Sequence, residues 1–395
     1  MYFCSSENYP YRKTNTHHIV MKFNISSKVF YNATSAVSKV INSKNTIAIL
    51  DNFLLALKGN ELTITGSDQE NALTASVEVT GAEGEGSFCL PARRLVELLK
   101  ELPDQGVKMN VNEETLEVEL KYSAGNYSFV GFPGDQYPVF EPAKGSEPIE
   151  FTIATEQIIG GLDNTMFAVS SDEYRQIMQG VLLDINPESI TYVATDTRKL
   201  VRYIDSRTAP GVKGSCVIPV KPANIIKNVF AKEESVTITM NSRNATIAGG
   251  KFKFQCTFLN GNYPDYNRVI PKSNSLELSV DRLSLLNAVR RVSLFVDSDG
   301  GLEKFRITPD KILLKSNDPS MCTSAREQVP CSFSGSELTI GFSALYLLEI
   351  LNTIKSTEIV VRLGDAARPG IFCPAEQPDN TELVMLLMPM TVGEF

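Results

Sequence analysis

The sequence predicts an α+β protein made of three structurally similar domains, each with two helices packed on antiparallel sheets. One series of elements, two amphipathic helices separated by strands, occurs three times along the 395 residues. The first helices are expected to start near residues 29, 155 and 281, a spacing of 126 residues (155−29 and 281−155). Self-similarity at a fixed period indicates repeated structural units, and about 100–150 residues is the commonest size of one domain.

The helices are predicted from apolar residues that recur every three or four positions and so share one face. Residues 29–41 and 91–102 show this pattern in the first repeat, and Pro91 is a residue favoured in a first helical turn. Helices are likewise expected from about residues 155, 219, 281 and 343, the last capped by Ser343. Alternating apolar residues predict strands between them, for example 62–65, 75–79, 181–185, 190–194 and 359–363.

Two proline-bearing connectors separate the repeats. The first is Glu141–Pro148, and the second is the strap Gly261–Pro271, which Pro264 and Pro271 stiffen because proline fixes φ. We therefore expect domains at residues 21–143, 149–268 and 269–395. Residues 1–20 contain no continuous apolar run, so we expect a disordered tail or an upstream start there, not a signal peptide.

The composition argues against the commonest enzyme designs. The only histidines are His17 and His18, so the repeats have no imidazole for acid–base work or metal ligation. The seven cysteines are scattered without a Cys-x-x-Cys pair, which predicts buried free thiols. No phosphate-binding glycine loop is present, and no apolar run approaches the ~20 residues that cross a bilayer. We expect a cytoplasmic protein without catalytic residues, metal or cofactor.

An aspartate recurs in the polar turn that follows a strand in each repeat. These residues are Asp68, Asp196 and Asp318. Because they occupy equivalent turns of three separate domains, they should lie far apart, and turn-capping is the better account. The alternative is a carboxylate- and Mg²⁺-dependent nucleic-acid enzyme, which would need Asp68 and Asp196 in one site.

Basic residues gather on the predicted helices although the net charge is −8. A basic helical surface suits phosphate contacts that do not depend on base sequence. Ordinary solvated helix faces remain the alternative, and Glu156 and Asp163 on the first helix of the second repeat weaken the pattern. The basic residues are Lys28, Lys39, Lys44, Arg93, Arg94, Lys100, Lys221, Lys227, Lys232, Arg282, Arg290 and Arg291.

Four motifs in order resemble the bacterial sliding clamps, the beta subunits of DNA polymerase III. They are Leu90–Arg94, Ala194–Asp196 leading to Leu200, Asn262–Pro271 and Leu386–Met390. The resemblance covers Met21 to about Val392. It implies a non-catalytic processivity factor of DNA replication, a head-to-tail homodimer that closes into a ring around double-stranded DNA. The partners it implies are the polymerase catalytic subunit, the clamp loader and other clamp-binding proteins, with no membrane.

The resemblance also assigns roles by matching position. It implies DNA contacts at Lys44, Arg93, Arg175 and Lys221. It implies a dimer interface that joins Tyr127 and Phe129 to Leu294 and Phe295 of a second copy. It implies a groove for partner peptides between the second and third domains, lined by Met178, Thr195, Leu200, Pro264, Arg268, Val269, Tyr346, Leu386, Met388, Pro389 and Met390.

The chain departs from the family pattern at three places, one of which is the extension Thr391–Phe395 after Met390. Thr197-Arg198-Lys199 stands where the family often has Gly-His-Arg, and Gln176 and Ile177 stand where aromatic residues are common. The departure at Gln176 and Ile177 removes the expectation of an aromatic DNA contact at that point. A repeat scaffold that does not bind DNA is a further alternative to the clamp.

Overall fold

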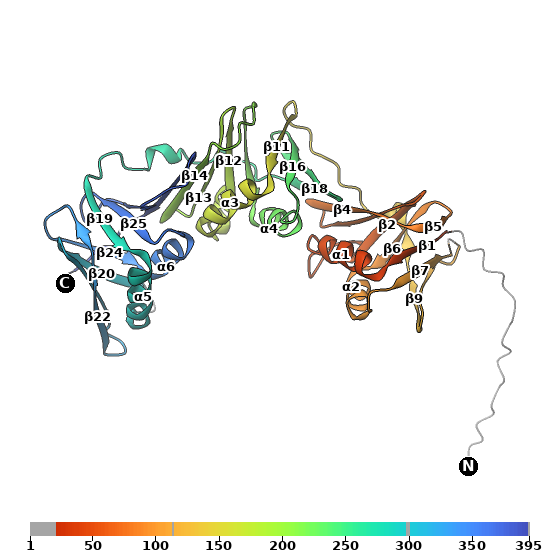
Figure 1. Ribbon diagram of the computed structural model, residues 1–395, viewed down its shortest axis with the longest axis horizontal. Helices are drawn as coiled ribbons and strands as arrows, with labels where there is room; N and C mark the ends of the chain where they lie inside the picture. The colour runs from red at the N-terminus through yellow and green to blue at the C-terminus, as the bar shows by residue number, and fades with distance from the viewer. Residues whose placement is uncertain (1–20, 113, 298–300, 394–395) are drawn as a thin grey trace, which may run out of the picture. The chain divides into compact units, whose positions relative to one another are not determined.

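A computed structural model of the protein describes residues 21–112, 114–297 and 301–393 (Figure 1). The predicted tail, residues 1–20, lies outside the described residues. The chain divides into two compact units at Phe140–Glu141. The first unit contains the first repeat, and the second unit contains the other two.

The first unit consists of two antiparallel layers of strands with two helices. One layer has the strand order β5-β1-β7-β8-β9: Thr80–Glu83, Met21–Ser26, Gly106–Val111, Glu117–Tyr122 and Gly125–Val130. In the other, the order is β10-β6-β2-β3-β4: Phe132–Pro133, Gly86–Pro91, Asn52–Lys58, Glu61–Ser67 and Asn71–Glu78. Helices α1 (Ser27–Val37) and α2 (Ala92–Glu101) lie side by side and bury apolar residues such as Phe30 and Leu95.

The second repeat has the same plan. Helices α3 (Thr155–Thr165) and α4 (Val220–Val229) accompany two groups of antiparallel strands. Four strands run in the order β18-β17-β16-β11: Phe252–Thr257, Asn244–Gly249, Ser235–Met240 and Ile149–Ala154. The others run β15-β12-β13-β14: Gly214–Pro219, Gly180–Asn186, Ser189–Thr195 and Lys199–Asp205. Helix α3 contacts β13 and β14, as Figure 1 shows.

The third repeat continues the sheet of the second. Strand β14 pairs with β27 from Lys199 opposite Leu387 to Asp205 opposite Thr381. Beyond β14, the order is β27-β26-β25-β19-β23: Thr381–Leu387, Gly370–Pro374, Glu358–Leu363, Leu276–Asp281 and Ser332–Phe333. A separate sheet has the order β22-β21-β20-β24: Thr323–Pro330, Lys311–Asp318, Leu302–Ile307 and Leu338–Ser343. Helices α5 (Arg282–Val292) and α6 (Ala344–Thr353) complete the repeat.

The helix positions confirm the predicted repeat. The first helices begin at residues 27, 155 and 282, and the second helices at 92, 220 and 344. Ser343 takes the predicted N-cap position of α6, but its side chain makes no capping hydrogen bond. Sequence patterns also missed strands such as β2, β20 and β22. Among the cysteines, Cys89, Cys216, Cys256 and Cys373 are buried as predicted, whereas Cys322 is exposed in a turn.

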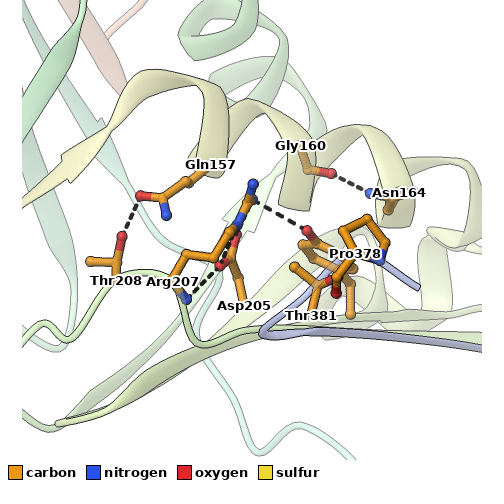
Figure 2. Close-up of polar contacts among 9 residues, drawn as sticks. Gln157, Gly160, Asn164, Asp205, Arg207, Thr208, Pro378 and Thr381 are labelled. Atoms are coloured by element: carbon orange, nitrogen blue, oxygen red, sulfur yellow. Dashed lines mark hydrogen bonds and ion pairs between the residues drawn. The ribbon is translucent and has the colours of Figure 1, made fainter. Parts of the chain in front are cut away.

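A polar cluster anchors the end of β14 that lies opposite Thr381. Asp205 is 2% exposed and accepts hydrogen bonds from the backbone N and the Nε of Arg207, each 3.0 Å long. Figure 2 shows this pair beneath α3, where Thr208 donates to Gln157. The charge-assisted pair therefore orders the segment after β14, and the Thr208–Gln157 bond joins this segment to α3.

A buried carboxyl interrupts the apolar core of the third repeat. Glu303 on β20 is fully buried, and neither of its carboxyl oxygens has a hydrogen-bond partner among the described residues. Burial, and to a smaller extent the charge of Glu327, raises the pKa of Glu303 to about 8. The side chain is therefore mainly protonated at neutral pH.

Candidate functional site

The turn between β13 and β14 forms one edge of the candidate site. The Thr195 Oγ1 donates to the Lys199 carbonyl (2.8 Å) and accepts from the Thr197 N–H (3.1 Å). The Asp196 Oδ1 accepts from the backbone N–H groups of Arg198 and Lys199, both at 2.8 Å. Asp68 and Asp318 accept two backbone N–H bonds in the same way, so the turn-capping prediction is confirmed.

An apolar pocket of about 160 Å³ opens beside this turn. Seven of the predicted groove residues line it: Met178, Thr195, Leu200, Pro264, Val269, Leu386 and Met388. Thr197, Lys199 and Tyr266 also line it and were not predicted. The pocket thus joins the second repeat, the strap and the last strand of the third repeat.

Strand pairing and the strap create the pocket. Leu200 lies opposite Leu386 in the β14–β27 ladder, and both are buried in one apolar cluster. Tyr263 and Tyr266 of the strap pack on that cluster, and the Tyr266 hydroxyl lies 3.1 Å from Asp184 Oδ2. At the mouth, Val269 is 47% and Met388 39% exposed. The site therefore offers apolar surface on a rigid frame, which suits an inserted apolar side chain.

Four predicted groove residues lie outside this lining. Arg268 is mostly exposed, and its Nε lies 2.8 Å from Asp265 Oδ2. Tyr346 does not line the pocket, and its ring contacts the ammonium of the lining residue Lys199. Pro389 and Met390 line a different cleft, because the Met390 N–H donates to the Gly341 carbonyl (2.8 Å) and carries the chain end over β24.

Of the three lining residues that were not predicted, Lys199 is the one with a buried charge. Its side chain is 5% exposed, and Nζ lies 2.5 Å from Glu349 Oε2 and 3.3 Å from Asp196 Oδ2. Nζ also lies 4.3 Å from the ring centroid of Tyr346. The only signal in the sequence was a lysine three positions after an aspartate in a turn, and Glu349 is 150 residues away.

The predicted DNA contacts occupy both units. In the first unit, Lys44 is exposed in the loop after α1, and Arg93 on α2 is exposed and pairs with Glu97 at 2.9 Å. In the second unit, Arg175 lies in the 3-10 turn Glu173–Met178, 3.4 Å from Asp172 Oδ2, and Lys221 is half-buried on α4. Surface pairs of this kind hold a cation only weakly, so both arginines stay available for phosphate.

The arginines of α5 contribute less to a basic surface than their number suggests. Arg282 donates to the carbonyls of Ser356 and Leu351, at 2.8 and 3.0 Å. Arg291 binds both carboxylate oxygens of Glu327, at 2.7 and 2.6 Å. These two guanidinium groups connect elements of the third repeat to one another.

The predicted interface residues lie on exposed apolar edges. Strand β9, which carries Tyr127 and Phe129, is the last strand of its sheet, and Tyr127 stacks on Tyr122 with ring centroids 6.1 Å apart. In the second unit, Leu294 is 79% exposed on the short helix Ser293–Phe295, beside the edge strand β22. An unpaired strand edge with apolar neighbours is a ready surface for another chain.

The described residues contain no group of three or more His, Cys, Asp or Glu that could hold a metal ion. No helix within the described residues is both long enough and apolar enough to cross a membrane. A polar cleft of about 440 Å³ lies elsewhere in the second unit, between Asn164 and Pro378, and contains no predicted site residue. Its mixed polar lining matches no chemistry that the sequence indicated, so the apolar groove is the better candidate site.

Comparison with known protein families accounts for almost the whole described chain. Models of the N-terminal, central and C-terminal domains of the DNA polymerase III beta subunit match residues 21–141, 152–265 and 267–391. The chain belongs to this family. The predicted family and the three-domain α+β clamp fold are therefore confirmed.

Related proteins and structures agree with this assignment. The beta sliding clamp of Pseudomonas aeruginosa is 25% identical over 92% of this chain and 99% of its own length. That of Treponema pallidum is 27% identical over 94% and 99%. A crystal structure of the P. aeruginosa clamp bound to griselimycin has a TM-score of 0.88 and 26% identity, and covers 94% of this chain and 100% of that one. The predicted function, a DNA sliding clamp of replication, is confirmed.

Proposed function

We propose that two copies of this chain close head-to-tail into a ring around duplex DNA. The ring neither makes nor breaks a covalent bond. The support is a pair of unlike edges, β9 with Tyr127 and Phe129, and Leu294 with Phe295 near β22. Because the two edges differ, each contact joins one kind of edge on one subunit to the other kind on the next. Such a heterologous contact gives a closed ring when the rotation between subunits brings the last free edge back to the first. Residues 21–143, 149–268 and 269–395 would be the three domains of each subunit, in a cytoplasmic protein.

DNA would be held through phosphate contacts that do not depend on base sequence. Exposed cations on α1, α2 and the loop after α1 support this role, and Lys44 and Arg93 are among them. Arg175 and Lys221 would contribute from the second repeat. Phosphate contacts fix position without sequence information, which a sliding ring requires.

The groove would bind a short apolar segment of the polymerase catalytic subunit, the clamp loader and other clamp-binding proteins. The pocket lined by Leu200, Val269, Leu386 and Met388 is the observation that carries this proposal. Methionine adapts to different side chains, which suits a surface that serves several partners. Tethering raises the concentration of polymerase at the primer end, so processivity follows without catalysis by the ring.

The Mg²⁺-enzyme alternative has no support in the site. Asp68 and Asp196 each accept two backbone N–H bonds in their own turns. The scaffold alternative, without DNA, is separated from the clamp by one experiment. Protein loaded onto a nicked circular plasmid by a clamp loader and ATP should stay bound through gel filtration, and cutting the plasmid once should release it. Equal retention on circular and linear DNA would contradict the ring.

A further inference from the structure

We propose that Lys199 is a positioning residue that couples the shape of the groove to the packing of the third repeat against the second. Its ammonium holds α6 against the turn Thr195–Lys199, so the wall that the partner peptide meets is set in part by Glu349, which does not line the pocket. This inference rests on the proposed partner groove.

Three elements converge on the Lys199 side chain. Glu349 and Tyr346 lie on α6, three residues apart and so on one helix face. Phe167, from the 3-10 turn after α3, places its ring centroid 5.9 Å from Nζ. Two carboxylates and two aromatic rings therefore surround one ammonium.

The backbone of the same residue builds the groove. Lys199 lines the pocket, and its carbonyl and N–H close the turn on Thr195 and Asp196. The neighbouring Arg198 carbonyl accepts from the Met388 N–H at 2.8 Å, and Met388 forms the lip of the pocket. A displacement of the ammonium would thus be transmitted through a single turn to both walls.

The cost of burying the Lys199 charge makes the complete set of its partners necessary. A lysine side chain that is only 5% exposed is tolerated only while its carboxylate partners and ring faces are in place. Glu349 does not line the pocket, so any effect of its substitution on peptide binding must act through Lys199. Glu349 is consequently the cleaner probe of the coupling.

The test compares four variants of the full-length protein: Lys199→Met, Lys199→Arg, Glu349→Gln and the double variant Lys199→Met/Glu349→Gln. The probe is a fluorescein-labelled synthetic peptide of the clamp-binding segment of the polymerase catalytic subunit, titrated by anisotropy. Each loss-of-charge single variant should weaken binding about tenfold, and the double variant should be no weaker than the worse single one. Lys199→Arg should bind within about threefold of the wild type, because arginine keeps the charge and stacks on rings.

The matched control is Lys227→Met, which removes an ion pair with Asp163 away from the groove. It should leave peptide affinity unchanged. Wild-type affinity in Glu349→Gln, or strictly additive losses in the double variant, would overturn the coupling while leaving the groove intact. Failure of the wild-type protein to bind the peptide would instead overturn the groove and the coupling together.

Discussion

The same turn occurs in the first and second repeats, but only the second copy belongs to a groove. Both turns place a hydroxyl, an aspartate and a left-handed residue in sequence: Ser67-Asp68-Gln69 with φ 81° and Thr195-Asp196-Thr197 with φ 77°. They differ in the residue that closes the turn. Asn71 turns back to Asp68, 3.1 Å away, whereas Lys199 reaches Glu349 in the next repeat. A structural turn thus gains a role in binding through one long side chain.

The residue that follows the turn also differs between the two repeats. Ala72 follows the first turn and Leu200 the second, and both are buried. Leu200 lines the pocket together with Pro264 and Val269 of the strap and Leu386 of β27. The comparison indicates that the groove is an elaboration of a common scaffold.

Leu200→Ala, which installs the residue of the first repeat, should have the largest effect. It should lower the free energy of unfolding by about 2–5 kcal/mol, because a cavity forms in the cluster with Leu182 and Leu386. Met388→Ala, at a site 39% exposed, should leave stability nearly unchanged and weaken peptide binding about tenfold. Urea unfolding and peptide anisotropy on both variants measure the two effects. Equal loss of stability in both would assign Met388 to the core.

Glu303 extends the comparison to the third repeat. Continuing the register of the strand pairs by one residue, it takes the place of Phe53 and Val181 in the other repeats. Its folded pKa is raised, so its contribution to stability is complete below pH 4.5 and is lost as the pH rises toward 8. Between pH 4.5 and pH 7 the loss should be about 3 kcal/mol.

Glu303→Gln should abolish this part of the pH dependence, since glutamine does not titrate. Thermal unfolding of the wild type and the variant across this pH range checks the prediction. Parallel stability curves for the two proteins would mean that the carboxyl is not held neutral by burial. Asp310→Asn, at an exposed turn of the same repeat, serves as the control for loss of one carboxylate.

The smallest effect concerns the left-handed residue shared by the two turns. A β-branched residue is strained at positive φ, and glycine is not. Thr197→Gly should therefore raise the free energy of unfolding by about 0.5–1 kcal/mol, and Gln69→Gly should raise it less, because glutamine is not β-branched. Differential scanning calorimetry of both variants measures this order, and the reverse order would show that strain at Thr197 is relieved by its contacts.

The sequence predicted those parts of the molecule that depend on local pattern. Helical periodicity located the six α-helices of the described residues within a few positions, and the recurrence of Asp68 and Asp196 predicted their turns. The sequence pattern could not place Lys199, since a lysine a few positions from an aspartate is common on surfaces and its partner Glu349 is remote in the sequence. It also assigned Pro389 and Met390 to the groove, because nothing local signals that the chain end crosses to Gly341.

Because the chain end crosses to Gly341, position 341 can influence the groove without lining it. A Cβ on Gly341 would lie 2.7 Å from Leu302 Cδ1, 3.0 Å from the Met390 carbonyl oxygen and 3.1 Å from Val392 Cγ2. A larger residue must displace the Leu302 side chain and crowd the chain end at Met390, and Met388 is only two residues upstream. In genetic terms, a screen for lost partner binding should recover alleles at a glycine that lines no part of the pocket.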